Sequence, residues 1–265
     1  MLRHIDDVAR ELGVEYFVTG ATARDILLDG VYGLDTGRAT RDVDLAIALD
    51  GWQRFEALKE RLVDTTKFAP DNQVIHRLFY LGRRGHSLDL IPFGRIEEPA
   101  AKIAWPPDRS IIMDVTGYRE AFAAAQAVEI QPDFSVRVVS LPGLAILKLF
   151  AWADRGATDP RDAGDFAALL HQYSAAGNED RLYGPEIEVL ETLNYDVDLA
   201  GARLLGRDAA RITTSATRDL LLALLSDAGL GRLVRDMARA TRAFADPIAT
   251  LGQRIAQFKA GLQEV

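Results

Sequence analysis

The chain contains no cysteine, and this absence excludes several kinds of site together. Disulfide frameworks, thiolate zinc sites, iron–sulfur clusters and cysteine nucleophiles all require that side chain. Histidine is scarce as well, with only four residues, and their spacing forms no metal-ligand set. We therefore assign no histidine to a site.

Positive charge is also in short supply. The 31 Lys and Arg residues are outnumbered by 39 Asp and Glu residues, which gives a net charge of −8. Because proteins that coat DNA are basic, this balance disfavours broad nucleic-acid binding, although it is compatible with a local basic groove.

Long apolar runs are missing. The best candidate, residues 144–152, is too short to span a bilayer and carries Lys148 in its middle. The first ten residues lack the apolar segment of a secretion signal. We therefore expect a soluble cytoplasmic protein that makes no membrane contact.

The remaining composition is that of an ordinary globular protein, and 265 residues suffice for one or two domains. Predicted strands and helices mix in the first two thirds, and helices dominate the last third. The fold class expected is α+β, with a core over residues 1–140 and a mostly helical region over residues 141–265.

The main chemical signal is a pair of aspartates in a predicted strand over residues 42–47. A strand has a side-chain period of two, so Asp42 and Asp44 share one face while the apolar side chains occupy the other. The two carboxylates repel each other unless a cation lies between them. Oxygen ligands of this kind suit Mg²⁺ or Mn²⁺, whereas a solvated strand end is the alternative interpretation.

The sequence holds an internal control for that motif. Asp-Val-Asp-Leu occurs at residues 42–45 and again at residues 196–199. The second copy leads into a helical pattern, where we expect Asp196 to cap the helix. The tetrapeptide alone therefore has little specificity, and only its context separates the two copies.

Two neighbouring segments favour the first copy. Asp89 is a lone acid in an apolar strand of a predicted hairpin, with its turn at residues 82–85, and it is costly to bury unless paired or metal-bound. Gly20 lies in a strand–turn–helix, where close backbone approach, free N–H groups, the Thr22 hydroxyl and Arg24 suit a phosphate. Taken alone, such a turn is more often only a turn.

Together, these segments resemble the polymerase-β-like nucleotidyltransferase superfamily, and they are most similar to its AbiEii/AbiGii-type nucleotidyltransferase toxin family. The matching segments, which lie within residues 14–174 or so, are GATARD at 20–25, TRDVDL at 40–45, LDLIP at 88–92, SLPGLAILK at 140–148 and RDAGDF at 161–166. The resemblance implies a mixed β-sheet with flanking helices, followed by a helical C-terminal region. It also implies Mg²⁺-dependent transfer of a nucleoside monophosphate from an NTP, ATP among them, to an acceptor.

The same resemblance implies a role for each matching residue. Asp42 and Asp44 hold the Mg²⁺ (or Mn²⁺) ions. Asp89 completes the catalytic and metal site, as the carboxylate nearest the attacking hydroxyl. The residues implied to bind the nucleotide are Gly20, Thr22, Arg24, Lys148 and Asp162.

Two of these residues have structural alternatives. Lys148 falls within an apolar helix stripe, where a lysine can simply cover apolar surface with its stem. The resemblance favours a phosphate contact, which predicts that Lys148→Met keeps its stability and loses transfer. Asp162 and Asp165 lie in the first turns of a helix, where they suit the helix dipole. For Asp162 the two interpretations are equally supported, and for Asp165 we favour the structural one.

The acceptor stays open. The resemblance implies a tRNA end or a protein hydroxyl, and a toxin of this kind implies an antitoxin protein as partner. The family often has Gly-Gly or Gly-Ser where this chain has Thr19-Gly20-Ala21, which keeps open a catalytically silent member that binds a nucleotide or a partner. The acidic composition keeps open an aminoglycoside-type small-molecule nucleotidyltransferase.

Overall fold

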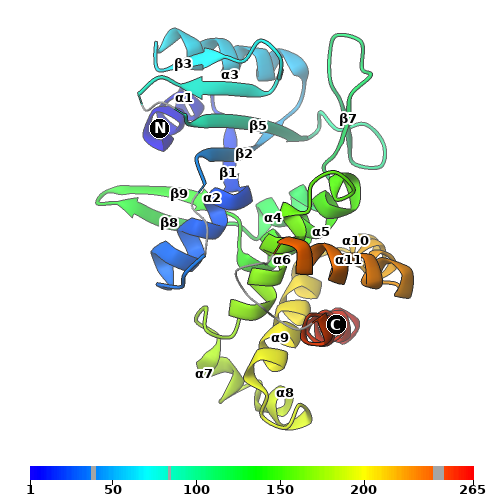
Figure 1. Cartoon of the computed structure of the whole chain (residues 1–265). Helices are drawn as coiled ribbons and strands as arrows, with labels where there is room; N and C mark the ends of the chain where they lie inside the picture. Colours follow the sequence, from blue (N-terminus) through cyan, green and yellow to red (C-terminus); the bar gives the residue numbers. More distant parts are fainter. Residues whose placement is uncertain (37–39, 83–84, 241–247) are drawn as a thin grey trace. The chain divides into compact units, whose positions relative to one another are not determined.

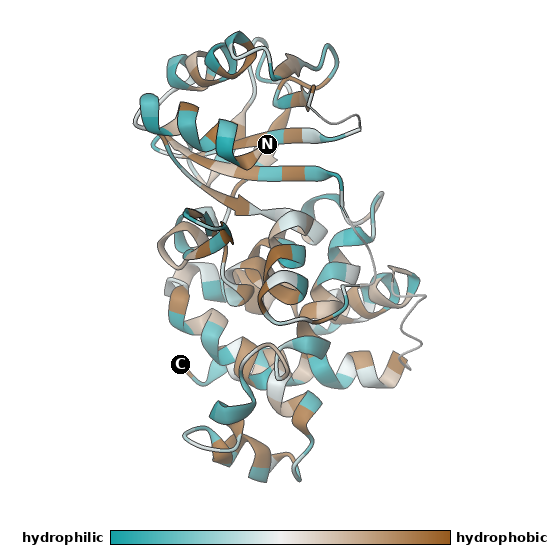
Figure 2. Cartoon of the chain, turned by 90° about the vertical axis from the view of Figure 1, so that its left-hand side faces the viewer, coloured by the Kyte–Doolittle hydropathy of each residue, from teal (hydrophilic) through white to brown (hydrophobic). Residues whose placement is uncertain are grey.

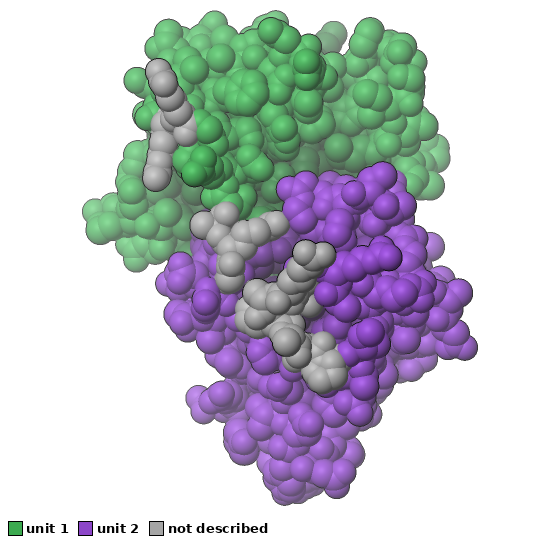
Figure 3. Space-filling model, in the orientation of Figure 1, with its two compact units in different colours: residues 1–23, 39–140 green, residues 24–38, 141–265 purple. Residues whose placement is uncertain are grey.

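A computed structural model describes residues 1–36, 40–82, 85–240 and 248–265 of the chain (Figure 1). The chain divides into two compact units, residues 1–23 with 39–140 and residues 24–38 with 141–265 (Figure 3). One change of unit falls at residue 140, and the second unit also takes in residues 24–38. Arg83 and Arg84 of the predicted hairpin turn lie outside the described residues.

The first unit is built on a mixed sheet of seven strands in the order β3-β4-β5-β2-β1-β9-β8 (Figure 1). The pairs β2·β5 and β1·β9 are parallel and the other pairs are antiparallel. The strands are β1 (Glu15–Thr19), β2 (Asp42–Leu49), β3 (Phe68–Pro70), β4 (Arg77–Tyr80), β5 (Ser87–Gly94), β8 (Gln126–Gln131) and β9 (Phe134–Val138), beside a separate pair, β6 (Lys102–Ala104) and β7 (Ile112–Asp114). This sheet confirms the predicted mixed architecture.

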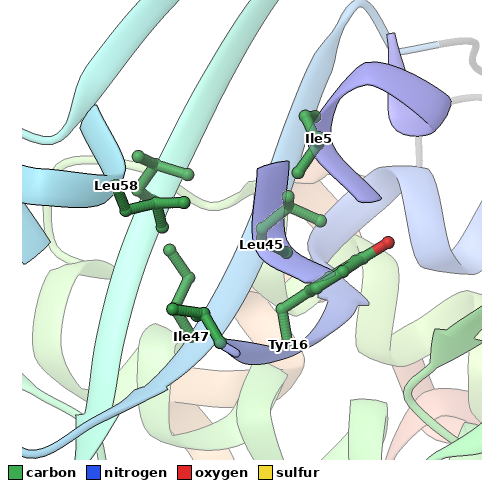
Figure 4. A pocket seen from close by; sticks show the side chains of 8 residues that line it. Ile5, Tyr16, Leu45, Ile47 and Leu58 are labelled. Carbon is green, nitrogen blue, oxygen red and sulfur yellow. The ribbon is translucent and has the colours of Figure 1, made fainter. Parts of the chain in front are cut away.

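Alternation along the strands gives the sheet two different faces (Figure 2). One face packs on helices α1 (Leu2–Glu11) and α3 (Trp52–Asp64) and is apolar. Side chains of Leu45 and Ile47 meet Ile5 and Leu58 there, around a small void of about 10 Å³ (Figure 4). The predicted apolar face of β2 is therefore the core face.

The opposite face changes character along the strands. Beneath helix α4 (Tyr118–Ala123) it is aromatic, with the Phe17 ring 5.7 Å from Phe93 and 6.0 Å from Phe122. Toward the beginning of β2 and β5 it is polar and carries Asp42, Asp44 and Asp89. The aromatic cluster anchors the sheet, and the polar end presents the predicted carboxylates.

The second unit is helical, as the sequence predicts. Its helices are η1 (Ile26–Val31), α5 (Leu141–Arg155), α6 (Arg161–Gln172), α7 (Glu179–Leu182), α8 (Ile187–Thr192), α9 (Val197–Ile212), α10 (Ser215–Leu224), α11 (Asp227–Ala240) and α12 (Ile248–Gln263), and α2 (Gly20–Asp25) ends in this unit. Helices α9 and α12 approach so closely that a side-chain carbon added to Gly206 would lie 2.1 Å from the Phe258 carbonyl oxygen. Asp196 caps α9 by accepting a hydrogen bond from the Leu199 amide at 2.9 Å, which confirms the interpretation of the second Asp-Val-Asp-Leu copy.

None of the described helices combines the length and the apolar character needed to cross a membrane.

Candidate active site

Strand register aligns polar side chains into a row across the sheet of the first unit. Thr19 on β1 pairs with Asp44 on β2, and Asp44 pairs with Asp89 on β5. Asp89 in turn pairs with Arg77 on β4. Side chains directly opposite each other on neighbouring strands share a face, so these four residues form one continuous row.

A second row lies next to the first. Asp42 pairs with Ser87 across the parallel strands β2 and β5. The Ser87 hydroxyl donates a hydrogen bond to Oδ1 of Asp42 at 2.6 Å. The sequence prediction that Asp42 and Asp44 share a face therefore extends to Asp89, because parallel pairing in this register brings all three carboxylates to one patch.

Asp89 is buried and already has a partner. Its carboxylate accepts two hydrogen bonds from Arg77, from Nε to Oδ1 and from Nη2 to Oδ2, each 2.7 Å long. These hydrogen bonds raise the pKa of the Arg77 guanidinium, and the negative charge of Asp42 acts in the same direction. The predicted need of a buried acid for a partner is met by this ion pair.

Sequence reasoning missed Arg77 because no motif contains it. The signal that was available is the hairpin itself, since strands joined near residues 82–85 bring Arg77 close to Asp89. A buried acid needs a partner, and the nearest candidate is a basic residue on the paired strand of the same hairpin.

Gly20 fits tightly against the carboxylate of Asp44. Its φ of +66° lies in the left-handed region, and a side-chain carbon placed on it would lie 1.9 Å from Oδ2 of Asp44. Glycine is required here for both reasons. Thr22 donates a hydrogen bond from its hydroxyl to the backbone oxygen of Asp42 at 2.7 Å, so it ties the turn to β2.

The donor chemistry of this patch fits a hard divalent cation. Asp42, Asp44 and Asp89 contribute only carboxylate oxygens, and Ser87 adds a hydroxyl. Among the residues that the structure describes, no three acidic or histidine side chains already form a complete ligand set. Both oxygens of Asp89 already accept a hydrogen bond from Arg77, so this carboxylate is shared with a cationic side chain.

Lys148 and Asp162 lie in the second unit, within a buried cluster of ion pairs. The Lys148 ammonium is 2.9 Å from Asp162 and 2.6 Å from Asp165. Arg155 binds the other oxygen of Asp162 at 2.7 Å, and Arg24 pairs with Asp165. Cations and carboxylates therefore alternate from Arg24 to Arg155.

The pKa values in this cluster reflect its balance of charge. Burial alone would lower the pKa of Lys148, but the charges of Asp165 and Asp162 outweigh it and raise the pKa above its ordinary value. Burial would raise the pKa of Asp162, yet Lys148 and Arg155 bring it below 3.8. Lys148 and Asp162 are therefore both charged near neutral pH.

The structure thus brings the predicted site residues together in two groups. Gly20 and Thr22 accompany the three aspartates in the first unit, whereas Arg24, Lys148 and Asp162 belong to one cluster of ion pairs in the second. Asp165, for which the sequence favours a structural role, connects Arg24 to Lys148. The triphosphate contacts implied for Arg24, Lys148 and Asp162 stay predictions.

Gly20→Ala is expected to lower nucleotide transfer by about a hundredfold, since a displacement of the order of 1 Å at a reacting group has that effect. The added carbon forces the Asp44 carboxylate to move. Gly13→Ala is the matched control, because Gly13 has φ +60° and nothing within 4 Å of the added carbon. Both variants should lose about 1 kcal/mol of stability from backbone strain, and equal transfer rates for the two would contradict the role of Gly20.

Asp162 is expected to make the free energy of unfolding depend on pH in the acidic range. Its folded pKa lies below 3.8, so its contribution is complete above that value and is lost as the pH falls. The difference in urea-unfolding midpoint between the natural chain and Asp162→Asn should therefore shrink from about pH 5 to about pH 2. A difference that stays constant over this range would show that Asp162 is not held ionised by its neighbours.

Comparison with known proteins gives a family match that spans nearly the whole chain. The family described as "Nucleotidyl transferase AbiEii toxin, Type IV TA system" matches residues 7–248. No curated protein matches the chain.

Several solved structures show weaker likeness. The antibiotic-resistance factor ANT(2'')-Ia is 16% identical, with a TM-score of 0.38 over 79% of this chain and 92% of that one. An antigenic nucleotidyltransferase-like protein from Paracoccidioides brasiliensis is 17% identical, with a TM-score of 0.41 over 69% of this chain and 85% of that one. A CCA-adding enzyme solved with ATP is 15% identical, with a TM-score of 0.25 over 94% of this chain and 60% of that one. Values this low establish no shared substrate.

Proposed function

The chain belongs to the AbiEii nucleotidyl transferase toxin family, and from this membership we propose that it uses a divalent cation to move a nucleoside monophosphate from an NTP to an acceptor hydroxyl. The acceptor oxygen forms a new bond to the α-phosphorus, the bond to the β-phosphate breaks, and pyrophosphate leaves. The hydroxyl proton passes to a base.

One observation carries this proposal: Asp42, Asp44 and Asp89 lie on one face of adjacent parallel strands, with Asp44 and Asp89 directly opposite each other. Asp42 and Asp44 would hold Mg²⁺ or Mn²⁺, and Asp89 would complete the set. When bound, such a cation neutralises charge on the phosphate oxygens and polarises the reacting groups.

The chain's own residues support this chemistry in distinct ways. Gly20 leaves the Asp44 carboxylate room at the turn, and Thr22 fixes that turn to β2. Ser87 orients one oxygen of Asp42. Asp89 is the carboxylate proposed to lie nearest the attacking hydroxyl and to take its proton.

The family description supports a toxin with an antitoxin protein as partner. We propose a tRNA end or a protein hydroxyl as the acceptor. The second candidate is a catalytically silent member, motivated by Thr19-Gly20-Ala21 at the turn, where the family often has Gly-Gly or Gly-Ser. A third is transfer to a cationic small molecule, which the net charge of −8 would attract.

Acceptor profiling separates these candidates. Each of the four α-³²P-labelled NTPs is incubated with the protein, Mg²⁺ and either total tRNA, a protein extract or a set of aminoglycosides. The proposal expects label on tRNA or protein together with released pyrophosphate. Label on aminoglycosides alone would support small-molecule transfer, and NTP binding without pyrophosphate release would support a silent member.

A further inference from the structure

We propose that Arg77 is a positioning residue that competes with the divalent cation for Asp89, so that the third carboxylate joins the site only when the cation displaces the guanidinium. This inference rests on the metal site proposed above. It assigns a role to a residue that belongs to none of the matching sequence motifs.

The ion pair engages both oxygens of Asp89, with one hydrogen bond to each. Nε and Nη2 of Arg77 each bind a different carboxylate oxygen at 2.7 Å, in the two-pronged arrangement that makes such pairs strong. A cation that uses Asp89 as a ligand therefore has to bind an oxygen that already accepts a hydrogen bond from a guanidinium, and repulsion between the two cations favours displacement of Arg77. The pair is set by strand register, because Arg77 and Asp89 are directly opposite on β4 and β5.

Asp89 lies where Arg77 and a bound cation would both be in reach of its carboxylate. Asp89 lies between Arg77 on one side and Asp44 on the other, in the row that crosses the sheet. Arg77 therefore neutralises charge in the carboxylate patch when no cation is bound. A divalent cation beside Asp44 would repel the guanidinium and attract Asp89, so the two cations oppose each other at one carboxylate.

The Arg77 guanidinium can move away from Asp89, because its side chain is partly exposed and a second acidic residue lies nearby. The side chain of Arg77 is 33% exposed, whereas that of Asp89 is 12% exposed. Asp71 is a second acidic neighbour whose charge acts on Arg77, and its backbone amide bonds to the Arg77 carbonyl oxygen at 3.1 Å. Arg77 can thus leave Asp89 without being buried unpaired.

The sign of the effect distinguishes this role from a purely structural one. If Arg77 competes with the cation, Arg77→Gln should tighten Mn²⁺ binding by about tenfold, the scale of one charged hydrogen bond. If Arg77 only braces the strands, its loss should leave Mn²⁺ affinity unchanged or weaken it. Arg77→Lys keeps the charge but loses the two-pronged geometry, so its affinity should fall between the two.

The experiment is a titration of the full chain with Mn²⁺, in which free Mn²⁺ is measured by electron paramagnetic resonance. The variants are Arg77→Gln, Arg77→Lys, Asp89→Asn and the double variant Arg77→Gln/Asp89→Asn. Arg61→Gln is the matched control, since Arg61 binds both oxygens of Glu11 at 2.9 Å on the same unit. Circular dichroism melting verifies that each variant is folded, and Arg77→Lys carries the test if Arg77→Gln is not.

Tighter binding in Arg77→Gln, intermediate binding in Arg77→Lys and no change in Arg61→Gln would support the proposal. The effect must also vanish in the Asp89→Asn background, because it acts through that carboxylate. Unchanged or weaker Mn²⁺ binding in the Arg77 variants, or an equal gain in Arg61→Gln, would overturn it. No Mn²⁺ binding even by the natural chain would instead refute the metal site of the proposed function, and this inference with it.

Discussion

Asp44→Asn is expected to lower nucleotide transfer by about a thousandfold or more while the protein stays folded. A bound cation contributes several kcal/mol to stabilising the transition state, and each 1.4 kcal/mol or so is a factor of ten in rate. Pyrophosphate release and a melting curve for each protein are the two measurements.

The repeated tetrapeptide provides the control for this prediction. Asp196→Asn makes the same chemical change in the second Asp-Val-Asp-Leu copy, where asparagine is an equally good helix cap. It should leave transfer and stability close to those of the natural chain. Asp198 is a poorer control because it pairs with the buried Arg254 at 2.9 Å. Full transfer by Asp44→Asn would remove Asp44 from the site.

Lys148→Met is expected to destabilise the protein by about 3–5 kcal/mol, the usual result of removing one partner from a buried ion pair. The Lys148 ammonium forms ion pairs with both Asp162 and Asp165, so its charge contributes to stability in addition to its methylene stem. Methionine would fill the space but leave two buried carboxylates without that cation. The free energy of unfolding in urea is the measurement.

A second substitution shows whether charge is the cause. Asp162→Asn in the Lys148→Met background removes one of the two carboxylates that Lys148 neutralises, and the other partner of Asp162, Arg155, is largely exposed, so the double variant should recover part of the lost stability. A purely phosphate-binding lysine predicts instead that Lys148→Met keeps its stability and loses transfer by about a hundredfold. An unfolding free energy equal to that of the natural chain would contradict the structural role.

The sequence predicts the polar face of the sheet well because the signal there is local. A period of two along residues 42–47 is enough to separate Asp42 and Asp44 from the core side chains. The helix cap at Asp196 is equally local, since the hydrogen bond spans only three residues. Such patterns need no knowledge of the tertiary fold.

The ion-pair partners of the charged residues, in contrast, could not be predicted from the sequence. Lys148 meets Asp162 fourteen residues away on another helix, and Arg24 meets Asp165 across 141 residues. Neither ion pair is marked by a periodic pattern or a motif in the sequence, because both depend on how the helices pack. The sequence therefore located the charged residues but could not show that Lys148 is already neutralised within its own unit.

The most direct test of this account is the Mg²⁺ dependence of pyrophosphate release by the natural chain, measured with each of the four NTPs and the acceptors described above. Release that requires Mg²⁺, stops with EDTA and is lost in Asp42→Asn and Asp44→Asn is the predicted result. Release that continues at full rate in EDTA or in both folded variants would contradict the claim that the carboxylate patch holds a cation for nucleotidyl transfer.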